Sequence, residues 1–168
     1  MGEPDGVVDL CARLQPAVYG ALLLYCGSRE TAEELTQETL ARVWEHWSEV
    51  TTMEQPDRWA LRVAFNLAKS TFRRRRVARS SQRLLLDVST ISDPDPSSGI
   101  VVRAAIATLP PRQRAAVVLR FYNDLSVADT ARALDCAPGT VKALTSQAIA
   151  GLRTRLGAVA FAMEERDA

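Results

Sequence analysis

Apolar residues recur three and four positions apart along most of the chain, which is the spacing that places side chains on one face of a helix. In the first such segment the apolar stripe is formed by Leu10, Leu14, Val18, Leu22 and Tyr25. Comparable stripes follow in the later segments, interrupted by one short polar stretch. This periodicity predicts an all-α protein.

Polar capping residues and prolines mark the expected helix ends. Ser28 precedes a helix that we expect to run from about Arg29 to Trp47, and Asp57 can cap a third helix. Pro16 lies inside the first helical segment, where a proline kinks or divides a helix. The first part of the chain is thus expected to contain three main helices.

The polar stretch "VSTISDPDPSSG" separates two parts of the chain. It covers residues 88–99, is rich in Ser, Pro and Asp, and shows no apolar periodicity, which is typical of a flexible linker. The sequence therefore predicts two small helical domains, residues 1–86 and 100–168, joined by a flexible linker over residues 87–99.

A formal net charge of +1 conceals an uneven distribution of charge along the chain. The first 54 residues carry ten acidic and three basic side chains, whereas residues 55–86 carry nine basic side chains and one acidic one. Unpaired like charges repel each other, and a polyanion relieves that repulsion while releasing its counterions. The basic segment therefore favours a nucleic acid as partner over a membrane surface or an acidic protein.

A helix-turn-helix pattern occupies the second predicted domain. A short helix capped by Ser126 is followed by a tight turn and by a longer helix that begins near Pro138, and Ala131 is small enough for a close crossing. Residues that point outward near the start of the longer helix could enter the major groove of DNA. They are Thr140, Lys142, Ala143, Thr145, Ser146 and Gln147. A helical hairpin without DNA-binding function remains an alternative.

Three motifs in one order resemble the extracytoplasmic-function sigma factors of bacteria. "ETAEELTQETLARVWEHW" is similar to the polymerase-binding helix of their second region, and "PDRWALRVAFNLAKSTFRRRR" to the adjoining promoter-melting and recognition helix. "LPPRQRAAVVLRFYNDLSVADTARALDCAPGTVKALTSQAIAGLRTRL" is similar to their fourth region, with Asp135 where the family usually has glycine. The resemblance implies a sigma factor that binds core RNA polymerase and bridges two promoter elements.

The resemblance also implies two surfaces for bacterial core RNA polymerase, its β′ clamp and its β flap. The acidic second helix is expected to dock on the clamp. The matching residues are Glu34, Leu35, Gln37, Glu38, Arg42 and Trp44. Leu35 and Trp44 could equally be ordinary core residues. An inhibitory anti-sigma factor is a further candidate partner.

Promoter DNA is the other partner that the resemblance implies. The third helix would contact the minus-ten element, and the second helix of the helix-turn-helix would contact the minus-thirty-five element. The residues expected at the minus-ten element are Arg58, Arg62, Asn66, Lys69, Arg73, Arg74, Arg75 and Arg76. Four consecutive arginines splay around a helix, so we expect two or three of them to bind phosphate.

No catalytic, metal or cofactor site is expected from the sequence. Cys11, Cys26 and Cys136 lie far apart without metal-ligand spacing, and His46 is the single histidine. We find neither a signal peptide nor an apolar run as long as a membrane span, and we expect a cytoplasmic protein that is not an enzyme. A stand-alone helix-turn-helix regulator and a helical protein-interaction adaptor remain alternative functions.

Overall fold

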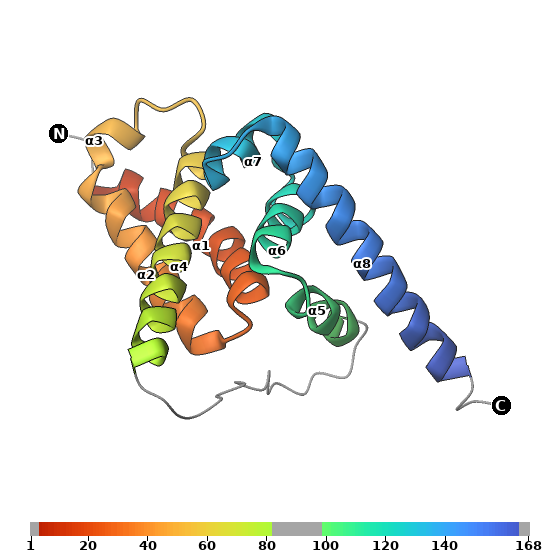
Figure 1. Cartoon of the computed structure of the whole chain (residues 1–168). Helices are drawn as coiled ribbons and strands as arrows, with labels where there is room; N and C mark the ends of the chain where they lie inside the picture. Colours follow the sequence, from red (N-terminus) through yellow and green to blue (C-terminus); the bar gives the residue numbers. More distant parts are fainter. Residues whose placement is uncertain (1–3, 82–98, 165–168) are drawn as a thin grey trace.

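The computed structural model describes residues 4–81 and 99–164, and all regular structure in these two ranges is helical (Figure 1). The predicted all-α class is therefore confirmed. The expected linker lies outside the described residues except for Gly99, which begins a helix. The boundaries assigned to the two domains stay a prediction. We call the helices before this gap the first lobe and those after it the second lobe.

The first lobe consists of three long helices and one short helix. These are α1 (Pro4–Cys26), α2 (Arg29–Glu45), α3 (Trp47–Val50) and α4 (Pro56–Ser81). Helices α1, α2 and α4 pack side by side, and α3 lies at the turn between α2 and α4 (Figure 1).

The second lobe contains the helix-turn-helix. Its elements are α5 (Gly99–Ala107), α6 (Pro111–Val117), the π-helical turn η1 (Val118–Tyr122), α7 (Val127–Leu134) and α8 (Pro138–Glu164). Helices α7 and α8 form the helix-turn-helix, and α8 continues far beyond the body of the lobe (Figure 1). The segment from Gly157 to Glu164 thus extends the last helix.

Two serine caps begin helices where the sequence predicts them. The backbone N–H of Thr31 donates to Ser28 Oγ over 3.3 Å, and that of Asp129 donates to Ser126 Oγ over 3.0 Å. A hydroxyl at this position satisfies an N–H group that has no partner within the helix. Pro138 begins α8, as expected for a residue whose missing N–H costs nothing there.

Other expected boundaries are wrong by a few residues. Helix α1 is continuous through Pro16, so the proline does not divide it. Helix α4 begins at Pro56, which places Asp57 in its first turn instead of at the cap. The second expected helix ends at Glu45, and a separate turn of helix follows it because His46 leaves helical geometry, with φ −103° and ψ 21°.

Both lobes contribute to one hydrophobic core. Leu22 of α1 and Phe65 of α4 belong to the same buried cluster as Leu119 and Leu125 of the second lobe. Helix α7 packs on α4, and α1 contacts α5, α6 and η1. The lobes therefore bury apolar surface against each other as well as within themselves.

Helix α1 is long and apolar enough over Gly6–Cys26 to cross a membrane, by length and composition alone. The expectation that the chain contains no such run is therefore wrong. In the fold the apolar stripe of this helix, including Leu14, Val18 and Leu22, is buried in the core and packs with α2 and α4. The hydrophobic residues of α1 thus serve the core.

Arg114 of α6 joins the ends of two other helices. Its Nη1 donates to the carbonyl oxygen of Tyr25 over 2.8 Å, and its Nη2 donates to those of Ala107 and Leu109. The last carbonyls of a helix lack partners within the helix and attract positive charge. Burial lowers the pKa of Arg114, while these carbonyls accept hydrogen bonds from both terminal nitrogens of its guanidinium.

A close approach of α1 to η1 adds to this lobe contact. A Cβ atom on Gly20 would lie 1.8 Å from the hydroxyl oxygen of Tyr122, so only a glycine admits the ring in its present place. Asn123 Nδ2 donates to the carbonyl oxygen of Ala17 over 3.3 Å. Side-chain contacts therefore hold η1 against α1 at two points.

Replacing Arg114 should destabilise the whole chain. In Arg114→Met the carbonyls of Tyr25, Ala107 and Leu109 lose their donor, and we expect the free energy of unfolding to fall by about 2 to 4 kcal/mol. Urea denaturation of the full chain measures this difference. Arg112→Met, at an exposed position of the same helix, is the matched control and should change the free energy little. Equal losses in both variants would contradict the role of Arg114.

Candidate nucleic-acid and polymerase interfaces

Five of the predicted minus-ten residues form one line along α4. They are spaced four, four, three and four residues apart, which keeps them on one face of the helix. We call this line the α4 stripe, and it consists of Arg58, Arg62, Asn66, Lys69 and Arg73. All are exposed except Arg58, which is half-buried. The stripe combines positive charge with one amide that can both donate and accept hydrogen bonds.

The four consecutive arginines point in different directions, as four adjacent residues on a helix must. Arg73 belongs to the stripe, and Arg76 lies one turn beyond it. Arg75 turns toward α2, where its Nη1 donates to Thr31 Oγ1 over 3.2 Å. Arg74 Nη2 lies 3.5 Å from Thr71 Oγ1. Arg75 thus has a partner inside the first lobe, away from the stripe.

The N-terminal end of the α4 stripe meets the helix-turn-helix. Arg58 forms an ion pair with Asp129 of α7, whose side chain is only 5% exposed. Asp129 also accepts hydrogen bonds from the Ser126 hydroxyl and, over 3.0 Å, from Arg132 Nη1. One buried carboxylate thus receives donors from both lobes.

These donors lower the pKa of Asp129 below the ordinary value of a carboxyl group. The hydrogen bond from Ser126 is the largest cause, burial opposes it, and Arg58 and Arg132 lower the pKa further. A carboxyl whose pKa is lowered in the folded state stabilises the fold above its ordinary pKa. That stabilisation is lost as the pH falls through the lower folded value.

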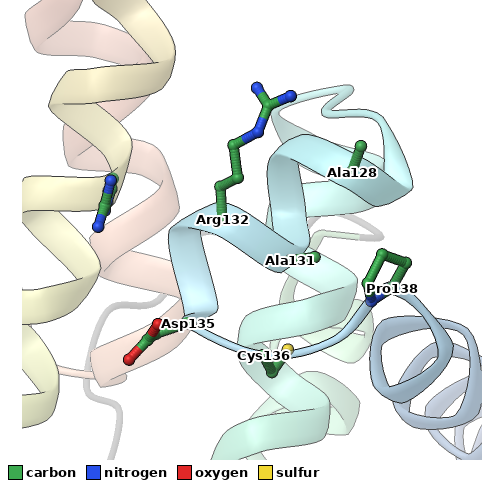
Figure 2. Close-up of a pocket in the computed structure, with 7 residues that line it drawn as sticks. Ala128, Ala131, Arg132, Asp135, Cys136 and Pro138 are labelled. Carbon is green, nitrogen blue, oxygen red and sulfur yellow. The ribbon is translucent and has the colours of Figure 1, made fainter.

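A cleft of about 390 Å³ lies beside this ion pair, between α4 and the turn of the helix-turn-helix. Arg62 lines it from α4, and Arg132, Asp135 and Cys136 line it from the second lobe. Figure 2 shows Asp135 pointing across the cleft toward α4. Asp135 has left-handed backbone geometry, with φ 53° and ψ 57°, at the end of α7. Arg62 and Asp135 thus line one cleft from opposite lobes, next to the ion pair of Arg58 with Asp129.

The predicted minus-thirty-five residues all lie in the first turns of α8. Lys142, Ala143, Ser146 and Gln147 are exposed, while Thr140 and Thr145 are half-buried. The position of the helix is set by Val141 and Ala148, both completely buried. The structure thus brings these residues together on the start of one helix, with Lys142, Ser146 and Gln147 exposed and the hydroxyl of Thr145 buried.

Two basic residues that the sequence analysis missed extend this surface. Arg120 of η1 and Arg153 of α8 line a groove of about 480 Å³ together with Lys142, Thr145 and Ser146. Arg153 follows Ser146 by two helical turns, so spacing could have found it. Arg120 donates to the carbonyl oxygen of Leu125 and reaches the groove from another element, which no local pattern indicates.

A further side chain that the sequence analysis missed contacts Gln147, one of the predicted minus-thirty-five residues. Gln113, in the first turn of α6, donates from Nε2 to Oε1 of Gln147 over 3.1 Å. The two residues are 34 positions apart in the sequence, so their pairing depends on how α6 packs against α8.

The solvent face of α2 carries five of the six predicted polymerase-contacting residues. Glu34, Gln37, Glu38 and Trp44 are exposed, with 56% of the Trp44 side chain accessible. Half-buried Arg42 joins them, because its Nη2 lies 2.9 Å from Glu38 Oε1. The sixth residue, Leu35, is 4% exposed and belongs to the core of the lobe.

No metal site occurs among the described residues, where no group of three or more potential ligands gathers. All three cysteines are half-buried and unpaired. Burial raises the pKa of Cys26 to about 12, so its thiol stays protonated near neutral pH. His46 packs its ring against Trp59 and lies with Nδ1 3.0 Å from the carbonyl oxygen of Arg42.

Two family models match this sequence, one in each lobe. The model described as Sigma-70 region 2 matches residues 10–77, and the model described as Sigma-70, region 4 matches residues 100–152. The RNA polymerase sigma-E factor of Streptomyces antibioticus is 30% identical over 142 residues, which is 81% of this chain and 79% of that protein. The ECF RNA polymerase sigma factor SigL of Mycobacterium tuberculosis is 30% identical over 136 residues, 77% of each chain.

Solved structures show the same fold. The sigma factor RpoE of Bartonella quintana, in complex with the anti-sigma factor NepR, aligns with a TM-score of 0.78 at 23% identity. The alignment covers 89% of this chain and 95% of that one. CnrH, in complex with the cytosolic domain of CnrY, aligns with a TM-score of 0.66 at 20% identity and covers 94% of this chain and 91% of that one.

Replacing Asp129 should weaken the contact between α7 and α4. In Asp129→Asn the negative charge that pairs with Arg58 and Arg132 is lost, and we expect the free energy of unfolding at pH 7 to fall by about 1 to 2 kcal/mol. The difference from wild type should shrink as the pH falls toward the folded pKa of Asp129, because wild type is then protonated as well.

Urea denaturation over a range of pH measures this difference. Asp124→Asn is the matched control, since Asp124 is exposed and its left-handed backbone suits asparagine equally well. A difference between Asp129→Asn and wild type that does not change with pH would contradict the assignment.

Proposed function

This chain belongs to the extracytoplasmic-function family of RNA polymerase sigma factors, and we propose that it binds core RNA polymerase and directs promoter recognition and transcription initiation. The observation that carries this function is the match of region 2 and region 4 models to consecutive parts of one chain. A sigma factor positions the polymerase and helps open the DNA strands, while the polymerase carries out the chemistry. The chain therefore acts in the cytoplasm and is no enzyme by itself.

The solvent face of α2 is the proposed docking surface for the polymerase clamp. Exposed carboxylates of Glu34 and Glu38 suit a basic partner, and Trp44 offers a large apolar ring at their side. Leu35 contributes indirectly, by fixing α2 in the core. A second contact with the polymerase, at the β flap, belongs to the second lobe.

The α4 stripe is the proposed surface for the minus-ten element. Its basic side chains can bond phosphates and so set the register of the DNA without reading its sequence. Asn66 can read a base edge, because its amide offers donors and acceptors. Since Asp129 already occupies Arg58, DNA that follows the whole stripe requires α7 to move away from α4.

The exposed start of α8 is the proposed reader of the minus-thirty-five element. Lys142, Arg120 and Arg153 surround the groove and can bond phosphates on either side of the helix. Ser146 and Gln147 are then available to base edges in the major groove. An anti-sigma factor is a proposed further partner, supported by the complex in which RpoE shares this fold.

Run-off transcription tests the function. Purified chain is added to bacterial core RNA polymerase on a library of genomic fragments, and we expect RNA starts that appear only when both proteins are present. Gln15→Ala, at an exposed position of α1, should give the same starts as wild type. Association with polymerase without any new start would contradict the proposal. A chain that binds palindromic duplex DNA as a dimer without polymerase would instead be a stand-alone regulator.

Removing Arg73 of the α4 stripe together with Arg76, one turn beyond it, should reduce the salt dependence of promoter binding. For holoenzyme carrying Arg73→Ala and Arg76→Ala, the slope of log affinity against log salt should fall by about 0.9 for each phosphate that is no longer neutralised. Filter binding to a promoter fragment at several salt concentrations measures the slope. Arg75→Ala is the control and should leave it unchanged, because Arg75 bonds Thr31 inside the lobe. A normal slope in the double variant would exclude phosphate binding by these arginines.

A further inference from the structure

We propose that Gln113 is a positioning residue that determines which end of the Gln147 amide faces DNA, and that it thereby selects a guanine for Gln147 to read. The inference rests on the proposed function, since it concerns the base preference of the same recognition helix. It is carried by one hydrogen bond between α6 and α8 and by the rigid packing on which that bond depends.

The hydrogen bond has a defined direction. Gln113 Nε2 is the donor and Gln147 Oε1 is the acceptor, at 3.1 Å. Gln113 is half-buried whereas Gln147 is exposed, so the residue closer to the protein interior holds the one that reaches outward.

The backbone on which Gln147 is placed cannot shift easily relative to α6. Ala148, the next residue, is completely buried and packs in one cluster with Leu109 and Val117. Leu109 precedes α6 and Val117 ends it, so this cluster ties α8 to both ends of the helix that carries Gln113. Close packing of this kind fixes the distance between the backbones that carry the two glutamines.

A glutamine amide presents two different edges to DNA. Its carbonyl oxygen accepts hydrogen bonds and its NH₂ group donates two of them. A free glutamine uses both ends at once on adenine, which offers the N7 acceptor and the N6 donor. When Oε1 is held by Gln113, the NH₂ group is the end directed outward. Two N–H donors match guanine, whose N7 and O6 are both acceptors in the major groove.

The hydrogen bond also prepares Gln147 for binding. A long, exposed side chain loses rotamer freedom when it is ordered at an interface, and this loss opposes binding. Because Gln113 already restricts the amide, part of that loss occurs before DNA arrives. Gln113 therefore influences base choice without touching the base.

Three substitutions of Gln113 separate this role from simple packing. Gln113→Lys leaves a donor opposite Gln147 Oε1 and should keep the guanine preference. Gln113→Glu leaves only acceptors, which should turn the amide so that its NH₂ group faces α6 and its Oε1 faces DNA. The preference should then move to cytosine, which offers a donor at N4. Gln113→Ala removes the partner and should allow adenine as well as guanine.

The measurement is transcription by holoenzyme from a promoter library in which every position of the upstream element is varied. Gln147→Ala first identifies the position that Gln147 reads, as the one whose preference disappears. At that position we expect the preference for guanine over the other bases to change at least about fivefold in Gln113→Glu and Gln113→Ala. Added charge at residue 113 alters affinity for all sequences alike, so the ratio between bases is the readout. Gln15→Ala, at an exposed position of α1, is the control and should keep the base preferences of wild type.

Two results would overturn the inference. One is an unchanged base preference in all three Gln113 variants, and the other is a Gln147→Ala holoenzyme with no altered position. In both cases wild-type holoenzyme still starts transcription at promoters, and the proposed function stands. Failure of the function looks different, because wild-type chain would then produce no promoter-dependent RNA from any library member.

Discussion

The carboxylate of Asp129 joins the two lobes at the point where both would meet DNA. It accepts a hydrogen bond from Ser126, the residue that caps the first helix of the helix-turn-helix, and it pairs with Arg58 at the start of the α4 stripe. Local helix formation and the placement of the second lobe therefore depend on the same group. A charge that is 5% exposed needs such partners, since burying it alone would cost several kcal/mol.

The ion pair between Arg58 and Asp129 stabilises the packing of the second lobe on the first, and it is weak enough to be broken. Arg58 is 40% exposed, so solvent and salt screen its attraction to Asp129. A phosphate offers Arg58 the same kind of partner, but α7 packs on α4 where Arg58 pairs with Asp129 and covers this end of the stripe. The arrangement with α7 on α4 and the arrangement with DNA along the whole stripe thus exclude each other. Arg114 and Tyr122 also contact α1 across the lobes, and these contacts must break when the lobes separate.

Sequence patterns predict the local features of this fold and fail where distant elements meet. The caps at Ser28 and Ser126 and the alignment of Arg62 with Asn66 depend on neighbours within one helix, so spacing is enough to find them. The burial of Asp129 beside Arg58 depends on the packing of α7 against α4, about 70 residues away. The position of Arg120 beside the α8 groove also depends on distant packing, because the π-helical turn η1 places it there.

The proposed minus-thirty-five interface divides base reading and phosphate binding between elements of the second lobe. The exposed start of α8 carries one positive side chain, Lys142, while Arg120 and Arg153 stand at the edges of the groove. Phosphate contacts dominate affinity and set the register, so a recognition helix with few cations depends on charges placed around it. Its uncharged side chains are then free to discriminate between bases. For a flexible amide such as that of Gln147, a partner that holds one end narrows the choice of bases, and Gln113 is placed to be that partner.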